Sequence, residues 1–280
     1  MGKMLSKFGS VLRDLQTTKC KKIKADNRPE AAFDLVFFSD AKGIKLLNAS
    51  LFSVYKKWKY LPKITIISDG TPIGDIKSKL TYWPKEVNII NWQECAAYYN
   101  NKNNKALYNY ACKDVWGKKF VSVLYCAEQG NILYSDTDVL WFKDPTPILN
   151  GATMPYMKMC PDIDFYYTEP MIKQLSEQKV YSKLPMNAGL IHATGAFSVY
   201  ENWEPLCNYL ETKSDNRSEQ TAFAILANAY GGVWSLKDIM LTIDDISEVL
   251  PKRNKYKDIF ARHYVNTKSW LFWRDYLLYF

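Results

Sequence analysis

The amino-acid sequence predicts an α/β protein in which helices flank a mostly parallel central sheet. Short apolar runs rich in β-branched residues alternate with longer segments of helical periodicity in the first half of the chain. Strands that alternate with helices are joined by right-handed crossovers, which produce a parallel sheet. The 280 residues are 48% hydrophobic and 15% aromatic, which is sufficient for a large buried core.

The first predicted unit is a β-α-β unit. The stretch FDLVFFSD, residues 33–40, predicts a buried strand that ends at Asp40, and residues 41–61 have helical periodicity. A second strand is expected at 63–68, immediately before Asp69. Ligands bind beyond the carboxyl ends of strands in open α/β sheets, so both acids are candidate ligand-binding residues.

A third strand is predicted at 87–92, before a long helical region. The stretch KDVWGKKFVSVLYCAEQG is typical of a helix that ends at Gly130. The run from Ile132 to Tyr134 predicts a further strand, which leads directly into two acids.

The second half of the chain is richer in loops. Asn187-Ala188-Gly189 indicates a small-residue turn that enters an apolar strand. Such a turn lets a ligand approach the backbone closely, so Asn187 and Gly189 are candidate binding residues. Ser218 is the expected N-cap of the helix that follows it.

The net charge of +8 and the pI near 9.0 suit an anionic ligand such as a nucleotide diphosphate. They would equally suit nucleic acid, an acidic membrane surface or mere solubility. The chain has neither a Gly-x-Gly-x-x-Gly motif nor a Walker loop, which argues against nicotinamide and P-loop nucleotide sites.

The cysteine pattern predicts free thiols in a reducing compartment, and therefore a cytoplasmic protein. No two of the six cysteines form a Cys-x-x-Cys pair; they are Cys20, Cys95, Cys112, Cys126, Cys160 and Cys207. No apolar run has the length of a membrane span, and the first residues have no signal-peptide pattern.

Residues 1–30 are predicted to form a basic extension before a single domain at 31–280. An apolar stripe within the extension predicts a helix that docks on this domain. Weak peripheral contact with a membrane is the alternative. The stripe consists of Met4, Leu5, Phe8, Val11, Leu12 and Leu15.

The stretch GNILYSDTDVLWFKDP places Asp136 and Asp138 inside a buried-strand pattern. Two carboxylates at i and i+2 of an extended chain point to the same side and can share one hard divalent ion. A solvated strand end is the alternative. A second Asp-x-Asp triplet at 162–164 has no predicted strand before it, so we expect only the first triplet to bind metal.

The chain has two histidines, His192 and His263. His192 lies in an apolar strand, where a core role and a ligand role are both open. His263 is followed closely by Lys268 and Trp270 in HYVNTKSWLFWRDY. An imidazole can supply a third metal ligand, and a nearby ammonium can neutralise a departing phosphate. A surface helix of mixed charge is the alternative.

The stretches LYSDTDVLWFKDP, NAGL, EQTAF and HYVNTKSW, in this order, resemble nucleotide-sugar-dependent glycosyltransferases of the GT-A fold. The glycogenin-like and galactosyl- or xylosyltransferase-like groups are the most similar. The resemblance covers about 33–270 and implies a Rossmann-like sheet, with a donor half at about 31–145 and an acceptor half at about 146–280. The short chain also resembles glycosyltransferases with which large algal viruses decorate their capsids, including xylose-transferring ones.

The resemblance implies a bound Mn²⁺ or Mg²⁺. Asp138 would bind this ion, Asp136 would contact the ion or the ribose, and His263 would complete the ligand set. The glycogenin-like signature has a Gly after this His and a Pro before the Trp, and it is one residue longer than the matching stretch here.

The resemblance also implies contacts to the donor. Lys268 would grip the diphosphate, next to Trp270. Lys118 or Lys119 would replace an arginine that usually faces the donor. The implied reaction moves a sugar from a UDP-sugar, such as UDP-xylose or a UDP-hexose, to a hydroxyl of a glycan or glycoprotein, and nucleic acid has no part in it.

Glu219, Gln220 and Asp245 are candidate catalytic residues. An inverting enzyme needs a carboxylate base on the acceptor hydroxyl, which Glu219 or Asp245 could supply. The sequence leaves open whether the anomeric configuration is retained or inverted.

Two other functions fit parts of the sequence. Haloacid-dehalogenase-like phosphatases also place Asp-x-Asp at a strand end, with the first acid as nucleophile. In those phosphatases the acids lie near the start of the chain, whereas Asp136 and Asp138 lie in the middle of it. The phosphatases also need a second pair of acids further along to bind metal, and Asp244-Asp245 lacks the Gly-Asp turn that such a pair has. A basic carbohydrate- or nucleic-acid-binding module would explain the many aromatic residues but not the clustered acids.

Overall fold

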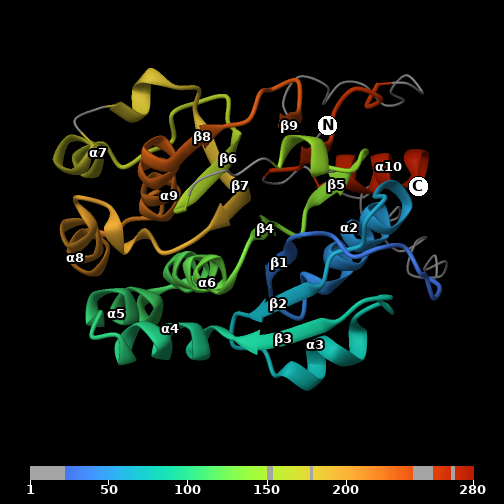
Figure 1. Ribbon diagram of the computed structural model, residues 1–280, viewed down its shortest axis with the longest axis horizontal. Coiled ribbons are helices and arrows are strands. Elements are labelled where there is room, and N and C mark those ends of the chain that lie inside the picture. Colours follow the sequence, from blue (N-terminus) through green and yellow to red (C-terminus); the bar gives the residue numbers. More distant parts are fainter. Residues whose placement is uncertain (1–22, 150–153, 177–178, 242–254, 266–268) are drawn as a thin grey trace.

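The structure is a computed structural model that describes residues 23–149, 154–176, 179–241, 255–265 and 269–280 (Figure 1). The apolar stripe expected to form an N-terminal helix lies outside these residues. None of the helices described has both the length and the apolar character needed to cross a membrane.

Strands and helices alternate through the first half of the described chain. The strands are β1 (Asp34–Ser39), β2 (Ile64–Ser68), β3 (Val87–Asn91), β4 (Ile132–Ser135), β5 (Val139–Trp141), β6 (Tyr156–Pro161), β7 (Met186–Thr194), β8 (Gly231–Val233), β9 (Ile239–Leu241) and β10 (Ala261–His263). The α-helices are α2 (Ile44–Lys57), α3 (Ile73–Lys79), α4 (Trp92–Asn101), α5 (Lys105–Lys113), α6 (Val115–Gln129), α7 (Glu169–Leu175), α8 (Trp203–Lys213), α9 (Ser218–Tyr230) and α10 (Ser269–Tyr279).

A seven-stranded sheet in the order β3-β2-β1-β4-β7-β6-β8 forms the centre of the molecule. Strand β1 pairs in parallel with β2 and β4, β2 with β3, and β6 with β8, whereas β7 runs antiparallel to β4 and β6. This confirms the predicted mostly parallel sheet. The chain moves from β1 to β3 on one side and returns to the other side of β1 with β4, which creates a switch point where ligands bind in such sheets.

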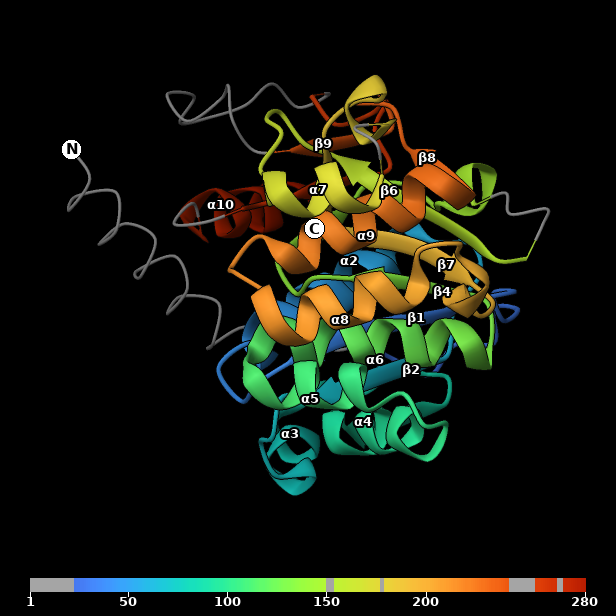
Figure 2. The same ribbon diagram turned by 90° about the vertical axis from the view of Figure 1, so that its left-hand side faces the viewer.

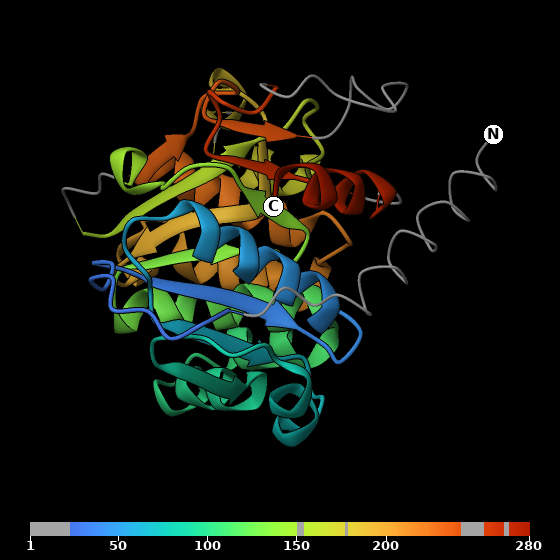
Figure 3. The same cartoon turned by 90° about the vertical axis from the view of Figure 1, so that its right-hand side faces the viewer.

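Helices cover both faces of the sheet because alternate strand residues point in opposite directions. Leu35 and Phe37 of β1 lie in one core cluster and Val36 lies in the other. Helices α4, α5, α6, α8 and α9 pack on the Val36 side (Figure 2). Helices α2 and α10 and the strands β5 and β10 pack on the opposite side (Figure 3).

The first predicted helix, expected at 41–61, is shorter in the structure. The Asp40 carboxylate accepts hydrogen bonds from the backbone N–H groups of Lys42 (3.1 Å) and Gly43 (2.6 Å). These bonds hold a turn before α2. The helix ends where Trp58 becomes extended and buries its indole at 2% exposure.

Two further expectations were wrong. Asn187-Ala188-Gly189 forms part of strand β7 and does not form a turn before it. The second Asp-x-Asp triplet does follow a strand, because β6 ends at Pro161. The apolar residues of YMKMCP pair with β7 across a register shift between Met159 and Cys160, an irregularity that the run of sequence letters does not reveal.

A three-stranded sheet in the order β5-β10-β9 lies beside the central sheet. Strand β10 is antiparallel to β5 and parallel to β9, so it joins a late segment of the chain to the segment directly after β4. The register places His263 opposite Val139. The small sheet therefore carries the histidine of the second half to the acids of the first half.

A buried carboxylate anchors this sheet to α10. Asp275 has no exposed surface, and its Oδ2 accepts hydrogen bonds from Tyr256 (2.7 Å), Tyr264 (2.7 Å) and Arg262 (2.8 Å). Its Oδ1 lies 2.6 Å from the Arg274 guanidinium. A buried acid is tolerated only when it is paired in this way.

Replacement of Asp275 tests this anchor. Asp275→Asn removes the buried negative charge that faces the guanidinium groups of Arg262 and Arg274, so we expect the free energy of unfolding to fall by about 3–5 kcal/mol. Asp258→Asn, at an exposed aspartate of the same region, should change it by less than about 0.5 kcal/mol. Urea denaturation measures both values, and equal stability of the two variants would contradict the anchor.

Candidate metal and nucleotide-sugar site

The two acids of the first Asp-x-Asp triplet lie in the turn between β4 and β5. The backbone N–H of Asp136 donates to the Gly189 carbonyl at 2.8 Å, and the Tyr134 hydroxyl donates to Asp136 Oδ1 at 2.5 Å. The sequence pattern predicted an extended chain with both carboxylates on one side. In the structure Asp136 and Asp138 lie in a turn instead, and this turn brings their carboxylates together.

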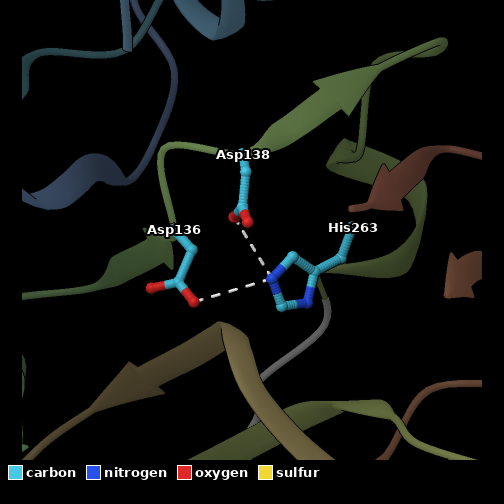
Figure 4. A group of neighbouring side chains, drawn as sticks. All are labelled: Asp136, Asp138 and His263. Atoms are coloured by element: carbon cyan, nitrogen blue, oxygen red, sulfur yellow. Dashed lines mark ion pairs between the residues drawn. The ribbon is translucent and has the colours of Figure 1, made fainter. Parts of the chain in front are cut away.

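His263 points into this turn (Figure 4). Its Nε2 lies 3.2 Å from Asp138 Oδ1 and 3.6 Å from Asp136 Oδ2. The backbone N–H of Tyr264 donates to the Asp138 carbonyl at 3.0 Å, which extends the pairing of β10 with β5 as far as the acids. Burial lowers the pKa of the imidazole, but Asp138, with a smaller contribution from Asp136, raises it well above its usual value.

The three side chains suit a hard divalent ion. One potential ligand atom from each of Asp136, Asp138 and His263 lies within 4.8 Å of the others. Carboxylate oxygen and imidazole nitrogen are ligands that Mn²⁺ accepts, and oxygen ligands also suit Mg²⁺. The raised pKa of His263 shows that the two carboxylates favour positive charge at this position.

The absence of a side chain at Gly189 allows the imidazole to reach this position. A Cβ atom on Gly189 would lie 2.0 Å from His263 Cε1 and 2.3 Å from Nδ1. The sequence predicted that this glycine lets a ligand approach the backbone. The structure places His263 in that space instead.

Lys119 lies on the other side of Asp136. Its ammonium is 3.2 Å from Asp136 Oδ1 and 3.3 Å from Glu219 Oε1, and it is almost fully buried. Burial lowers the pKa of this ammonium, but Asp136 and Glu219 outweigh the burial and hold the pKa above its usual value. Burial raises the pKa of the Glu219 carboxyl to about 7, against the opposing effect of Lys119.

These charged groups line a cavity of about 730 Å³. Asn187 and Gly189, predicted to bind a ligand, and Gln220, a candidate catalytic residue, also line it. So do Asp162 and Asp164 of the second triplet, which the sequence analysis set aside. Asp162 Oδ2 accepts a hydrogen bond from the Asn187 amide at 3.0 Å.

Other predicted residues lie away from this cavity. Asp69 accepts hydrogen bonds from Thr71, as Asp40 does from its own loop. The Lys118 ammonium donates to the Asp69 carbonyl at 3.0 Å and lies 4.7 Å from the centre of the Trp92 ring. These groups cluster at the carboxyl ends of β1 and β2, beside β4 in the same sheet.

The late part of the predicted site differs from expectation. Trp270 is 6% exposed in the hydrophobic core, where the Arg274 guanidinium lies 5.6 Å from its ring, so the structure gives it a packing role. Lys268 and Asp245 lie outside the described residues. His192 is buried with Nε2 2.8 Å from Asn131 Oδ1, and burial lowers its pKa to about 4, which fits a core role.

Comparisons with known proteins show what this chain resembles in sequence and in fold. Residues 126–242 match the model of the nucleotide-diphospho-sugar transferase family. No curated protein sequence matches the chain. The matched segment contains the Asp-x-Asp turn, Asn187 and Glu219, and it ends before β10.

Solved glycosyltransferases have the same fold. The galactosyltransferase LgtC, solved with donor and acceptor sugar analogues, is 14% identical, with a TM-score of 0.53 over 84% of this chain and 88% of that chain. Mouse xyloside xylosyltransferase 1 is 9% identical, with a TM-score of 0.57 over 84% and 98%. The bifunctional glycosyltransferase WbbM is 13% identical, with a TM-score of 0.56 over 89% and 48%. The fold is therefore GT-A, and the predicted resemblance is confirmed in its fold.

Substitution of Gly189 tests the position of the imidazole. The Cβ atom of Gly189→Ala would displace the His263 ring, so we expect affinity for Mn²⁺ to fall about tenfold or more. Gly74→Ala is the matched control, because a Cβ atom there meets nothing within 4 Å. Mn²⁺ titration followed by electron paramagnetic resonance measures both affinities, and unchanged affinity in Gly189→Ala would refute the assignment of His263 as a ligand.

The buried Glu219 should make stability depend on pH. Its folded pKa of about 7 is above the ordinary 4.5, so the folded state holds the proton more tightly and stability falls as the pH rises from about 4.5 through 7. Glu219→Gln removes this proton. Wild type should lose stability between pH 5 and pH 8 through Glu219, and the variant should not. The free energy of unfolding of the variant minus that of wild type should therefore increase by about 2–3 kcal/mol over this range.

Urea denaturation in EDTA at both pH values provides this measurement. Glu204→Gln, at an exposed position of α8, is the control and should follow the wild-type protein at both pH values. A difference between Glu219→Gln and wild type that stays constant with pH would show that Glu219 does not titrate in this range.

Proposed function

We propose that the protein is a metal-dependent glycosyltransferase that moves a sugar from a UDP-sugar to a hydroxyl of a glycan or glycoprotein. The observation that carries the proposal is the convergence of Asp136, Asp138 and His263 at the switch point of a GT-A sheet, on the wall of a large cavity. Ligands of α/β sheets bind at this edge, and clustered acids there require a cation.

Asp136, Asp138 and His263 would hold Mn²⁺ or Mg²⁺. A divalent ion bound there neutralises the charge of a diphosphate leaving group. Lys119 holds the Asp136 carboxylate in place from the opposite side at 3.2 Å. Since this lysine is buried between two carboxylates, its ammonium stays charged and fixed, which keeps the Asp136 side chain pre-organised.

The nucleoside end of the donor would lie over β1 and β2. Asp40, Asp69 and Lys118 cluster there, beside the partly buried ring of Trp92. We further propose that Lys268, five residues after His263, meets the diphosphate as charge develops on it.

The sugar would occupy the cavity beyond the metal ligands. Asp162 and Asn187 bond to one another on its wall and offer an acceptor and donors to sugar hydroxyls. Glu219 and Gln220 both line this cavity, but Glu219 is only 4% exposed and is paired with Lys119. This favours Gln220 over Glu219 as a group that contacts the reacting centre, and leaves Glu219 a role in positioning Lys119.

Turnover of the donor tests the proposal. In a panel of UDP- and GDP-sugars with Mn²⁺ present, slow hydrolysis of at least one UDP-sugar should release UDP, and EDTA should stop it. Asp138→Asn should lower the rate at least about a hundredfold, because it removes a negative ligand. Asp75→Asn, at an exposed acid of α3, should keep the wild-type rate.

The product distinguishes the rival phosphatase. A glycosyltransferase releases UDP or GDP with the sugar, whereas a phosphatase releases inorganic phosphate. Release of phosphate from sugar phosphates that depends on Asp136, with no nucleoside diphosphate from any donor, would overturn the proposed function.

A further inference from the structure

The mouth of the cavity carries exposed apolar side chains. Trp116, Ile163 and Tyr166 line the cavity and are 41%, 51% and 52% exposed. They come from the first turn of α6 and from the loop between β6 and α7. Large apolar groups grouped at a cavity mouth mark a surface that a ligand covers.

Polar contacts hold the Tyr166 ring in position. The Gln220 amide donates to the Tyr166 carbonyl at 3.3 Å, and the Asn216 amide donates to its hydroxyl at 3.4 Å. The Arg217 guanidinium lies 5.6 Å from the centre of the ring. Asn216 and Arg217, directly before α9, therefore hold the ring, while half of the Tyr166 surface stays open to solvent.

The charges at this mouth disfavour an anion. Asp162 and Asp164 line the cavity next to the exposed side chains. Lys119 and His263 are the cations on the described part of the lining, and both are buried against carboxylates. Arg217, beside the Tyr166 ring, is paired with Asp215 at 3.6 Å. The mouth therefore carries more acids than free cations, which disfavours a carboxylate or phosphate and favours a neutral ligand.

We propose that Trp116 and Tyr166 form a stacking platform for a neutral pyranose ring of the acceptor glycan. One face of a pyranose presents C–H groups, whose slightly positive hydrogens match the negative face of an aromatic ring. Asn216, Gln220 and Asp164 offer donors and acceptors to its hydroxyls. This proposal rests on the proposed function and adds the acceptor class, a neutral glycan.

Acceptor binding is measured apart from catalysis. Saturation-transfer NMR records the binding of the methyl pyranosides of glucose, galactose, mannose and xylose to protein saturated with UDP and Mn²⁺, with methyl glucuronide as the anionic probe. At least one neutral pyranoside should bind wild-type protein, more tightly than the glucuronide. Trp116→Ala and Tyr166→Ala should each weaken this binding about fivefold or more.

Tyr82→Ala is the matched control, because Tyr82 is 56% exposed in the segment between α3 and β3 and does not line the cavity. It should bind the pyranoside as wild type does. All three variants should show the wild-type increase in Tm on addition of UDP and Mn²⁺, because none of the three residues belongs to the metal cluster.

The two failures are distinguishable. If UDP and Mn²⁺ leave the wild-type Tm unchanged, the proposed function fails and the platform with it. If they raise it, the platform alone is overturned by any of three results: no neutral pyranoside binds, the glucuronide binds more tightly, or Trp116→Ala and Tyr166→Ala bind as Tyr82→Ala does.

Discussion

The site depends on one constraint: the negative charge of the Asp136 carboxylate must be balanced by nearby cations. Asp136 stands at the end of a buried strand, where an ionised acid requires a cation. One oxygen meets Lys119 from α6 at 3.2 Å, and the other faces His263 from β10 at 3.6 Å. Two elements far apart in the sequence are thereby held against one turn.

Each compensating group needs support of its own. A buried ammonium next to a single carboxylate would be poorly solvated, and Glu219 supplies the second anion at 3.3 Å, which fixes the start of α9 against α6. His263 needs a neighbour without a side chain, which Gly189 provides, and a rigid strand, which the buried Asp275 secures through Arg262. The groups that compensate the acids of this turn therefore depend on contacts from three helices, α6, α9 and α10.

Three kinds of group line the cavity. Acids face an imidazole at the switch point, and Asp162 and Asn187 form a polar pair on the wall. Trp116 and Tyr166 are exposed parts of the lining. These groups correspond to the parts of the proposed reaction, a metal-bound diphosphate, a sugar with hydroxyls and a glycan that must lie within reach.

The sequence by itself determined the α/β class, the first β-α-β unit and the strand that leads into Asp136, because strand and helix periodicities are local features. It did not reveal that the 162–164 triplet follows strand β6, because this strand pairs irregularly with β7 and its sequence lacks a regular strand pattern. Only the tertiary structure decided that Gly189 makes room for His263 and that Glu219 pairs with Lys119. These contacts join residues about 75 to 100 positions apart, and no local pattern specifies which buried charges meet when separate elements pack.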